Sequence, residues 1–507
     1  MKSNFRIDDI KLSQWIIILL TLFVGGYLLV NTPAVLFFIT IFSLIMMFSI
    51  KSSDFRVSIV AFIVLFIPTT DYFPFLDFNS YLPINIGLPL NMYTITIGIV
   101  ILVTILEKII NKELFLINKE VFKFELIFGA YILVLIISLF NTTSVTAGLK
   151  DILRFISFTY LVFWVCISNI KSKDSLLKLF KTLVIFVSIL SLYGIVEFIL
   201  GRNIYFEIFR GWGSTNFVYD GGKRVFSTLG HPNILASIIS CIIPLNLSLI
   251  IESKDDKSIK LFVASTYINF IALVLTFSRA SWLACAISVL VFVLIQKDKK
   301  KIKDILIKYF VPTFIVTAIT SIGAIILSEN VRYSLYYLIV TRLNIQNILN
   351  SGSFTYRSVK ILTAKKIISQ HPLIGVGYAN YSNISDLPQY KYYLDTNVIK
   401  VLDNNYLTIL VETGIFGFIA FASMFFDILK NARKAIYLKD GITCSILSIL
   451  ISAASFELFR ITPISVVLWL IIGMMFADIN IKNDNRKNNT RIGYLKEYYY
   501  KIKYFIK

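Results

Sequence analysis

Charged side chains are scarce in this chain, and residues that bind metals are scarcer still. Of its 507 residues, 16% are charged, whereas a soluble domain carries about 25%. There are two histidines and four cysteines, and the cysteines lie in apolar runs without the CxxC spacing of a metal site. We therefore expect no metal site and no cofactor. We interpret the cysteines as small packing residues: Cys166, Cys241, Cys285 and Cys444.

Long hydrophobic runs dominate the chain instead. Hydrophobic residues make up 57% of the sequence, and the mean hydropathy is +0.76. Runs of about 17 to 25 residues recur from end to end, and each can cross a hydrocarbon core of about 30 Å as a helix. Membrane barrels show short alternating segments instead. The sequence therefore predicts an all-α, polytopic membrane protein with about 12–14 transmembrane helices.

Basic residues orient these spans. Lys and Arg outnumber Asp and Glu by 50 to 30, and cytoplasmic loops carry the excess of cations in membrane proteins. With the N-terminus inside, most Lys and Arg fall on the inner side, including the clusters Lys108–Lys123, Lys171–Lys181 and Lys297–Lys308. We therefore expect a multi-pass protein of the cell membrane with both termini in the cytoplasm. Its first span, Gln14–Asn31, would be a retained signal anchor.

Two segments on the expected outer side are longer than turns, and both are rich in cations. Long translocated loops largely escape the orientation rule, so their charge indicates an anionic partner. The expected organisation has N-terminal transmembrane helices, an outer loop, a transmembrane core, a large and partly helical outer loop domain, C-terminal transmembrane helices and a basic, aromatic cytoplasmic tail. These parts are 1–200, 201–232, 233–327, 328–403, 404–481 and 482–507.

Two amphipathic segments are expected to contact phospholipid. In Phe354–Gln370, a helical stripe would contain Phe354, Ile361, Leu362 and Ile368, with lysines around the rest. This segment is either a helix on the outer leaflet or part of a site for an anionic ligand. Gly493–Lys507 mixes Tyr with Lys, which is typical of an anchor to the inner leaflet.

Three arginines stand at the expected outer boundary. Arg279 lies in a short break between two long apolar runs, Arg224 precedes a polar loop before the next span, and Arg357 opens the amphipathic segment. A cation at the membrane boundary raises the free energy unless it is paired. A guanidinium binds phosphate through two parallel hydrogen bonds, which lysine cannot reproduce. The arginines therefore either converge on one diphosphate or reach separately to phospholipid head groups.

Four motifs follow one another along the chain: RVFSTLGHPN at Arg224–Asn233, SRASWL from Ser278, HPLIGVG at His371–Gly377 and NNYLTILVETGIFG from Asn404. In this order and spacing, from about residue 224 to residue 417, the chain resembles the O-antigen ligase superfamily. That group includes O-antigen ligases and bacterial polysaccharide polymerases of the Wzy type. The resemblance implies a metal-independent, inverting glycosyl transfer at the outer face of the membrane. The donor would be a glycan on undecaprenyl diphosphate.

The resemblance also implies roles for individual residues. The three arginines would hold the donor diphosphate. Ligases of this family carry a histidine where this chain has Asn404, and an amide cannot act as a general base. Either Asp403 takes the proton instead, or proton removal needs little help from the protein. Glu412 is either catalytic or a buried carboxylate bonded to a neighbouring helix, so the catalytic candidates are Asp403, Asn404 and Glu412.

The remaining motif residues are expected to shape loops. Each histidine precedes a proline, and glycine permits tight turns and close approach of backbones. The predicted structural residues are His231, Asn233, His371, Gly375, Gly377 and Asn405.

The missing histidine favours a polymerase of surface polysaccharide, such as capsule or lipopolysaccharide, that moves a growing glycan onto the next lipid-linked repeat unit. Ligation of finished glycan to another acceptor is the alternative within the same chemistry. The expected partners are the undecaprenyl-diphosphate-linked glycan, the phospholipid membrane, and a flippase and a chain-length regulator of the same pathway. No nucleic acid is expected.

Three other classes stay open. A lipid-linked oligosaccharide flippase would have a similar number of spans but would need little mass outside the membrane, whereas 328–403 lies outside. A glycosyltransferase with a dolichol-phosphate-type donor would show acidic residues in its first outer loop. Here that loop is Asn31–Pro33 and contains no carboxylate. The third class is a non-catalytic assembly or signalling protein.

Overall fold

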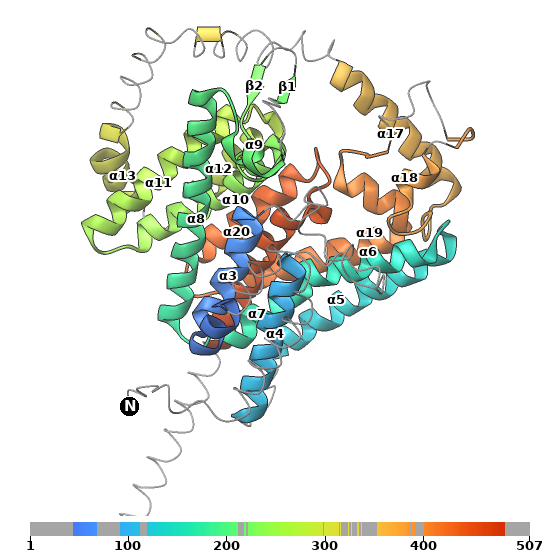
Figure 1. Cartoon of the computed structure of the whole chain (residues 1–507), viewed down its shortest axis with the longest axis horizontal. Coiled ribbons are helices and arrows are strands. Elements are labelled where there is room, and N and C mark those ends of the chain that lie inside the picture. The colour runs from blue at the N-terminus through green and yellow to red at the C-terminus, as the bar shows by residue number, and fades with distance from the viewer. Residues whose placement is uncertain are drawn as a thin grey trace, which may run out of the picture.

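The computed structural model shows a body of packed helices (Figure 1). The residues that it describes are 44–67, 92–111, 119–210, 217–219, 222–297, 299–313, 352–385, 387–390 and 400–481, with six single helical residues between 315 and 336. The expected signal anchor and the cytoplasmic tail lie outside the described residues.

The helices follow the hydrophobic runs along the chain. In the first half they are α3 (Ser53–Phe66), α4 (Met92–Ile110), α5 (Lys119–Ser138), α6 (Val145–Phe158), α7 (Tyr160–Asn169), α8 (Lys173–Leu200) and α9 (Ile204–Arg210). In the second half they are α10 (Pro232–Glu252), α11 (Asp256–Leu275), α12 (Arg279–Ile295), α13 (Lys299–Ile305), α17 (Gly352–Gln370), α18 (Tyr381–Ile384), α19 (Asn405–Ala432), α20 (Lys439–Ser452) and a last helix, Thr462–Ile481. Short turns of other helix types are η5 (Leu139–Asn141), η6 (Leu306–Phe310) and η8 (Leu458–Arg460).

Within the described ranges, eight helical segments are long and apolar enough to cross a membrane, and α12 is a shorter apolar helix. α5 with η5 forms one of these segments, and α6 with α7 forms another, which is interrupted at Thr159. The predicted all-helical, polytopic membrane fold is confirmed.

The core of the body is built around α10 and the last helix. In each of them 89% of the most apolar window is buried, whereas the other long spans bury between 33% and 50% of theirs. A helix that is apolar all round belongs in the interior, and one that is half exposed presents its apolar side to lipid. α10 packs against α11, α12 and α20, so the central layer is drawn from the second half of the chain.

A small hairpin departs from the all-helical pattern. β1 (Phe217–Tyr219) and β2 (Gly222–Arg224) pair antiparallel within the expected outer loop, with Phe217 opposite Arg224. Figure 1 shows this hairpin next to α9, and it shows α17 and α18 beside α19. The hairpin ends at Arg224, which it delivers to the helical body.

Candidate functional site

The hairpin brings Arg224 to the turn between α11 and α12. Its Nε donates to the carbonyl of Thr276 at 2.8 Å, and the next amide, that of Val225, donates to the carbonyl of Leu275 at 3.3 Å. Arg279 is the first residue of α12, three positions after Thr276. Two arginines from distant parts of the chain therefore flank one short turn.

The start of α12 adds a further attraction for anions. Helix N-termini carry partial positive charge and free amide hydrogens, and Arg279 is half-buried there. A second Arg224 contact, from Nη2 to Asn233 Oδ1 at 2.9 Å, ties the guanidinium to the first turn of α10. The turn thus has Arg224 bonded to its carbonyl at Thr276 and Arg279 three positions later, at the N-terminus of α12.

A buried carboxylate holds the loop that follows Arg224. Glu197 Oε2, at the end of α8, accepts the amides of Phe226 at 3.2 Å and Ser227 at 2.8 Å. Ser227 has a φ of 56°, a strained value for a residue with a side chain, and the carboxylate satisfies the amides of that turn. Glu197 was not among the residues predicted from the sequence, although a carboxylate inside a predicted span is a signal.

His231 caps the start of α10. Its Nδ1 accepts the amide of Asn233 at 3.1 Å, so the neutral ring carries its hydrogen on Nε2. The ring stacks on Phe456 at 5.0 Å between centroids. Burial, reinforced by the charge of Arg224 and opposed by that of Asp403, lowers the pKa of His231 to about 4. The imidazole is therefore neutral at pH 7.

This depressed pKa predicts a pH dependence of stability. The unfolded chain takes up the proton near pH 6.5, before the folded chain does, so the stability that His231 contributes is lost as the pH falls from about 6.5 to about 4, by up to about 3 kcal/mol. Because asparagine is also a good N-cap, His231→Asn should keep the helix start and remove the titration. Thermal unfolding of the purified protein at pH 7.5 and 4.5 should show a larger loss for the wild type than for the variant. Equal losses would contradict this assignment.

Asp403 and Asn404 lie at the start of α19, close enough for Asp403 to affect the pKa of His231. Asp403 has a φ of 53°, and its Oδ2 is 2.5 Å from Nζ of the buried Lys360. Asn404 is the N-cap of α19, and its Oδ1 accepts the amides of Tyr406 and Leu407. The amide at the usual histidine position is thus engaged in capping, whereas the carboxylate is partly exposed.

Lys360 reaches Asp403 from the buried face of α17, which differs from the predicted stripe. Thr363, Ala364 and Ile367 share that face, whereas Ile361 and Leu362 are exposed. Arg357 is exposed as well and lies one helical turn before Lys360. α17 therefore packs on the protein partly through the polar contact of Lys360 with Asp403, which a pattern of hydrophobic residues cannot predict.

The HPLIGVG motif fills a break in α19. Gly414 interrupts the helix with a φ of 64° and a ψ of −166°, a region that is open to glycine almost alone. The amide of Ile415 donates to the carbonyl of Pro372 at 2.9 Å, and the amide of Gly377 donates to the carbonyl of Glu412 at 2.9 Å. The loop therefore pairs with backbone groups that the broken helix leaves free.

The glycines of this loop approach α19 closely. Gly375 has a φ of 68°, and a Cβ there would lie 2.5 Å from the amide nitrogen of Thr413. Gly377 has a φ of 104°, and a Cβ there would lie 2.6 Å from Cβ of Thr142. His371, at the start of the motif, has Nε2 3.2 Å from the hydroxyl of Tyr390.

Glu412 lies just before the break, and both of its oxygens are occupied. They accept the amides of Ala379 at 2.9 Å and Tyr381 at 3.3 Å. They also form a two-point ion pair with the guanidinium of Arg460. Arg460 in turn lies over the ring of Tyr378, 4.7 Å from its centroid. The carboxylate thus joins α19, the HPLIGVG loop and the segment before the last helix.

This arrangement predicts that the main effect of Glu412→Gln is a lower free energy of unfolding rather than a direct loss of the catalytic step. Arg460 would keep its charge without its partner, and its side chain is 31% exposed, so a loss of about 2–3 kcal/mol is expected. Thermal unfolding measures this effect, with the exposed Asp304→Asn as a control for loss of a carboxylate. Wild-type unfolding together with a loss of turnover would contradict this structural role and would point to Glu412 as the general base.

The segment before the last helix was missed by the sequence analysis, yet it connects these contacts. Its Phe456 stacks on His231, and Glu457 Oε1 accepts the amide of Leu402 at 2.9 Å and the hydroxyl of Thr408 at 2.7 Å. Asn405, predicted as structural, accepts the amide of Phe459 at 3.3 Å. Arg279 was predicted because it is a lone arginine in a short turn between two apolar runs. Arg460 stands in the same kind of turn and could have been predicted in the same way.

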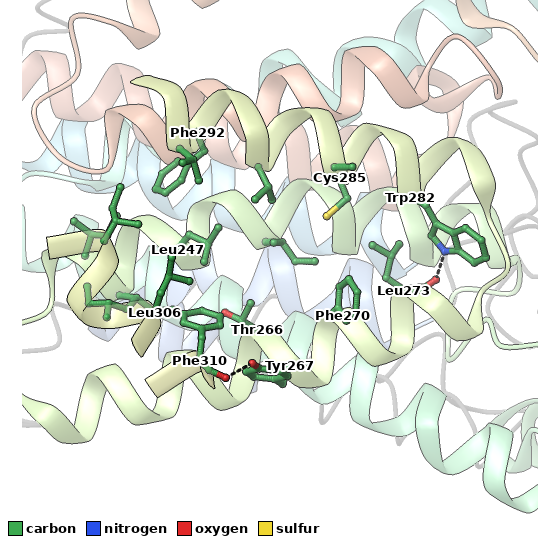
Figure 2. A pocket seen from close by; sticks show the side chains of 18 of the residues that line it. Leu247, Thr266, Tyr267, Phe270, Leu273, Trp282, Cys285, Phe292, Leu306 and Phe310 are labelled. Carbon is green, nitrogen blue, oxygen red and sulfur yellow. Dashed lines mark hydrogen bonds between the residues drawn. The ribbon is translucent and has the colours of Figure 1, made fainter. Parts of the chain in front are cut away.

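An apolar pocket of about 600 Å³ opens beside the arginine turn (Figure 2). Its walls come from α10, α11, α12, α13 and η6. At one end Trp282 donates to the carbonyl of Leu273 at 2.8 Å. Trp282 lies one helical turn after Arg279, and Leu273 lies shortly before Thr276. From there the pocket runs along α12 to Phe292, about 15 Å away at 1.5 Å per residue. Its volume is about four times that of an engineered cavity that binds benzene.

Comparison with known proteins bears on the second half of the chain. Residues 264–422 match the family model described as O-antigen ligase (Wzy_C), a span that runs from α11 to the middle of α19 and includes Arg279, Arg357, Asp403 and Glu412. No curated protein matches the chain. Arg224 and Arg460 lie outside the matched residues, but in the fold they contact Thr276 and Glu412, which lie within them. Among the residues that the structure describes, no group of three His, Cys, Asp or Glu is placed to hold a metal ion.

Proposed function

We propose, from the match of residues 264–422 to the O-antigen ligase family model and from the apolar helices of the chain, that the protein is a membrane-bound polysaccharide polymerase. Members of this family are glycan-transferring enzymes with lipid-linked substrates. The proposed reaction moves a growing glycan from undecaprenyl diphosphate onto the non-reducing end of the next lipid-linked repeat unit. It takes place at the outer face of the cell membrane, with both termini of the chain in the cytoplasm.

The observation that carries the proposal is the hydrogen bond from Arg224 to the α11–α12 turn at Thr276, three residues before Arg279. In the reaction an acceptor hydroxyl attacks the anomeric carbon, and the bond from that carbon to the diphosphate oxygen breaks with inversion. Negative charge grows on the leaving diphosphate, and preorganised guanidinium groups stabilise it where it forms. No metal is needed in this scheme, because two guanidinium groups and the N-terminus of α12 oppose the charge.

The acceptor side of the reaction is assigned to the start of α19. Asp403 is the candidate general base, since Asn404 is engaged in capping and Glu412 is buried with both oxygens occupied. Asp403 is paired with Lys360 but remains partly exposed. Lys360 orients the Asp403 carboxylate, which can receive the proton of the acceptor hydroxyl as its oxygen bonds to carbon. Arg357, exposed on α17, would then contact the substrate only after that helix and the glycan come together.

The apolar pocket beside α12 supports a lipid-linked donor. It begins one turn from Arg279 and is lined by apolar side chains along the length of the helix, so a prenyl chain in it would leave its diphosphate at the arginines. Such a chain gains free energy roughly in proportion to the apolar surface that it buries. The pocket thus matches the tail of the donor, as the arginines match its head.

The experiment incubates the purified protein with lipid-linked repeat units and follows product length by electrophoresis. A ladder of products supports the polymerase. A single transfer to a distinct acceptor makes the protein a ligase, the second candidate, and movement between leaflets without a change in length makes it a flippase.

A further inference from the structure

A second, smaller pocket lies on the other side of the Glu412–Arg460 pair. It has a volume of about 80 Å³ and is lined by Asp151 and Arg154 of α6, Tyr378 and Arg460, together with three phenylalanine rings. α6 belongs to a segment that is apolar enough to span a membrane. Charged residues inside such segments mark functional sites more often than not, and neither Asp151 nor Arg154 has a role in the proposed reaction.

Among the described residues, the Nε of Arg154 has no hydrogen-bond acceptor. This atom is buried, and the contact found for the guanidinium among the described side chains is with the ring of Phe158, at 5.4 Å. The other arginine of the pocket, Arg460, is neutralised by Glu412. A buried donor atom without an acceptor is unfavourable, so the half-buried Arg154 presents a cation that an external acceptor would satisfy.

The walls of the pocket restrict what that acceptor can be. A water molecule needs about 10–15 Å³ of cavity volume, so a volume of about 80 Å³ accommodates a small polar group such as a carboxylate. Asp151 adds a negative charge, which repels a doubly charged phosphate more strongly than a singly charged carboxylate and accepts hydrogen bonds from sugar hydroxyls. Burial raises the pKa of Tyr378 to about 12, so its hydroxyl keeps its proton at pH 7.

We propose that this pocket binds the carboxylate of an acidic sugar in the glycan substrate, through the guanidinium of Arg154. The proposal rests on the proposed function, since it takes the substrate to be a glycan. The Arg460 side chain is 31% exposed, which leaves the pocket open to a substrate. Glu412, which pairs with Arg460 in the pocket wall, lies nine residues after Asp403 in the chain. The acidic sugar is therefore recognised away from the reacting bond and sets which repeat units the enzyme accepts.

The experiment measures binding rather than transfer. The probes are a hyaluronan tetrasaccharide with glucuronate at its non-reducing end, the same tetrasaccharide with its carboxyl groups reduced to alcohols, and inorganic phosphate. Affinities are measured for the full chain in nanodiscs. The wild type should prefer the acidic probe about tenfold or more, because a charge-assisted hydrogen bond is lost with the carboxylate. Arg154→Gln should bind the two tetrasaccharides alike, and the exposed Arg433→Gln should keep the preference.

Three outcomes would overturn the assignment. In the first, the acidic probe fails to bind the wild type, and the pocket then holds water only. In the second, Arg154→Gln keeps the preference for the acidic probe. In the third, phosphate displaces the acidic probe, and the site then binds a phosphate group. Arg279→Lys separates this proposal from the proposed function, since that variant should lose transfer and keep the preference for the acidic probe.

Discussion

Arg279→Lys is expected to lower the turnover of lipid-linked repeat units by roughly 10²–10³-fold, the usual effect of removing one preorganised donor that stabilises charge in a transition state. Lysine keeps the positive charge, so encounter with the anionic donor should change little. What is lost is the pair of parallel hydrogen bonds that a planar guanidinium forms with phosphate. The measurement is the initial rate of product formation at saturating donor, which reports the chemical step rather than binding.

The exposed Arg433→Lys is the matched control for this substitution, since it makes the same chemical change at an exposed position. It should turn over like the wild type. Arg224→Lys should fall with Arg279→Lys, because its guanidinium holds the same turn through Thr276 and also contacts Asn233. Turnover of Arg279→Lys within a factor of about three of the wild type would remove the two-point diphosphate contact from the account.

Gly414→Ala is expected to prevent recovery of folded protein. The native φ of 64° with a ψ of −166° is closed to alanine. A Cβ at this position would lie 2.6 Å from the amide nitrogen of Ile374 and closer still to the carbonyl of Leu373. The HPLIGVG loop would have to move away from α19, and the hydrogen bonds that satisfy the broken helix would be lost with it. The combined loss in the free energy of unfolding exceeds about 4 kcal/mol, a value that single substitutions rarely reach.

Gly129→Ala provides the comparison. Gly129 lies on the exposed side of α5, where an added Cβ meets no atom within 4 Å, and alanine favours a helix over glycine by about 1 kcal/mol. This variant should be as stable as the wild type or slightly more stable. Size-exclusion chromatography and thermal unfolding in detergent measure both variants. A monodisperse Gly414→Ala protein with a wild-type unfolding temperature would contradict the described loop contact.

The helices could be predicted from the sequence because an apolar run of sufficient length is a local property. The hydrophobic runs of α10 and α11 gave the positions of these helices, and the break at SRAS became the α11–α12 turn. The same runs do not reveal which helices are enclosed, since α10 and α8 are similarly apolar yet differ in burial. That difference arises from packing between distant segments.

The site was predictable where a residue departs from its surroundings. Arg279 stands out because it interrupts two apolar runs, and Arg460 and Arg154 could have been found in the same way. The pairing of Glu412 with Arg460 was beyond a sequence argument. It depends on the break at Gly414 and on a contact between segments 48 residues apart. The amphipathic stripe of α17 was misjudged because Lys360, a polar residue, forms the contact with Asp403.

The measurement that tests the account most directly is the affinity of the purified protein for undecaprenyl diphosphate and undecaprenyl monophosphate, determined by native mass spectrometry. The two lipids share one tail, so the apolar pocket contributes equally to both, and any preference reports the arginines. We predict that the wild type prefers the diphosphate at least about tenfold and that both Arg224→Lys and Arg279→Lys lose the preference. Equal affinities in the wild type, or a preference that survives both substitutions, would contradict a diphosphate site at the α11–α12 turn.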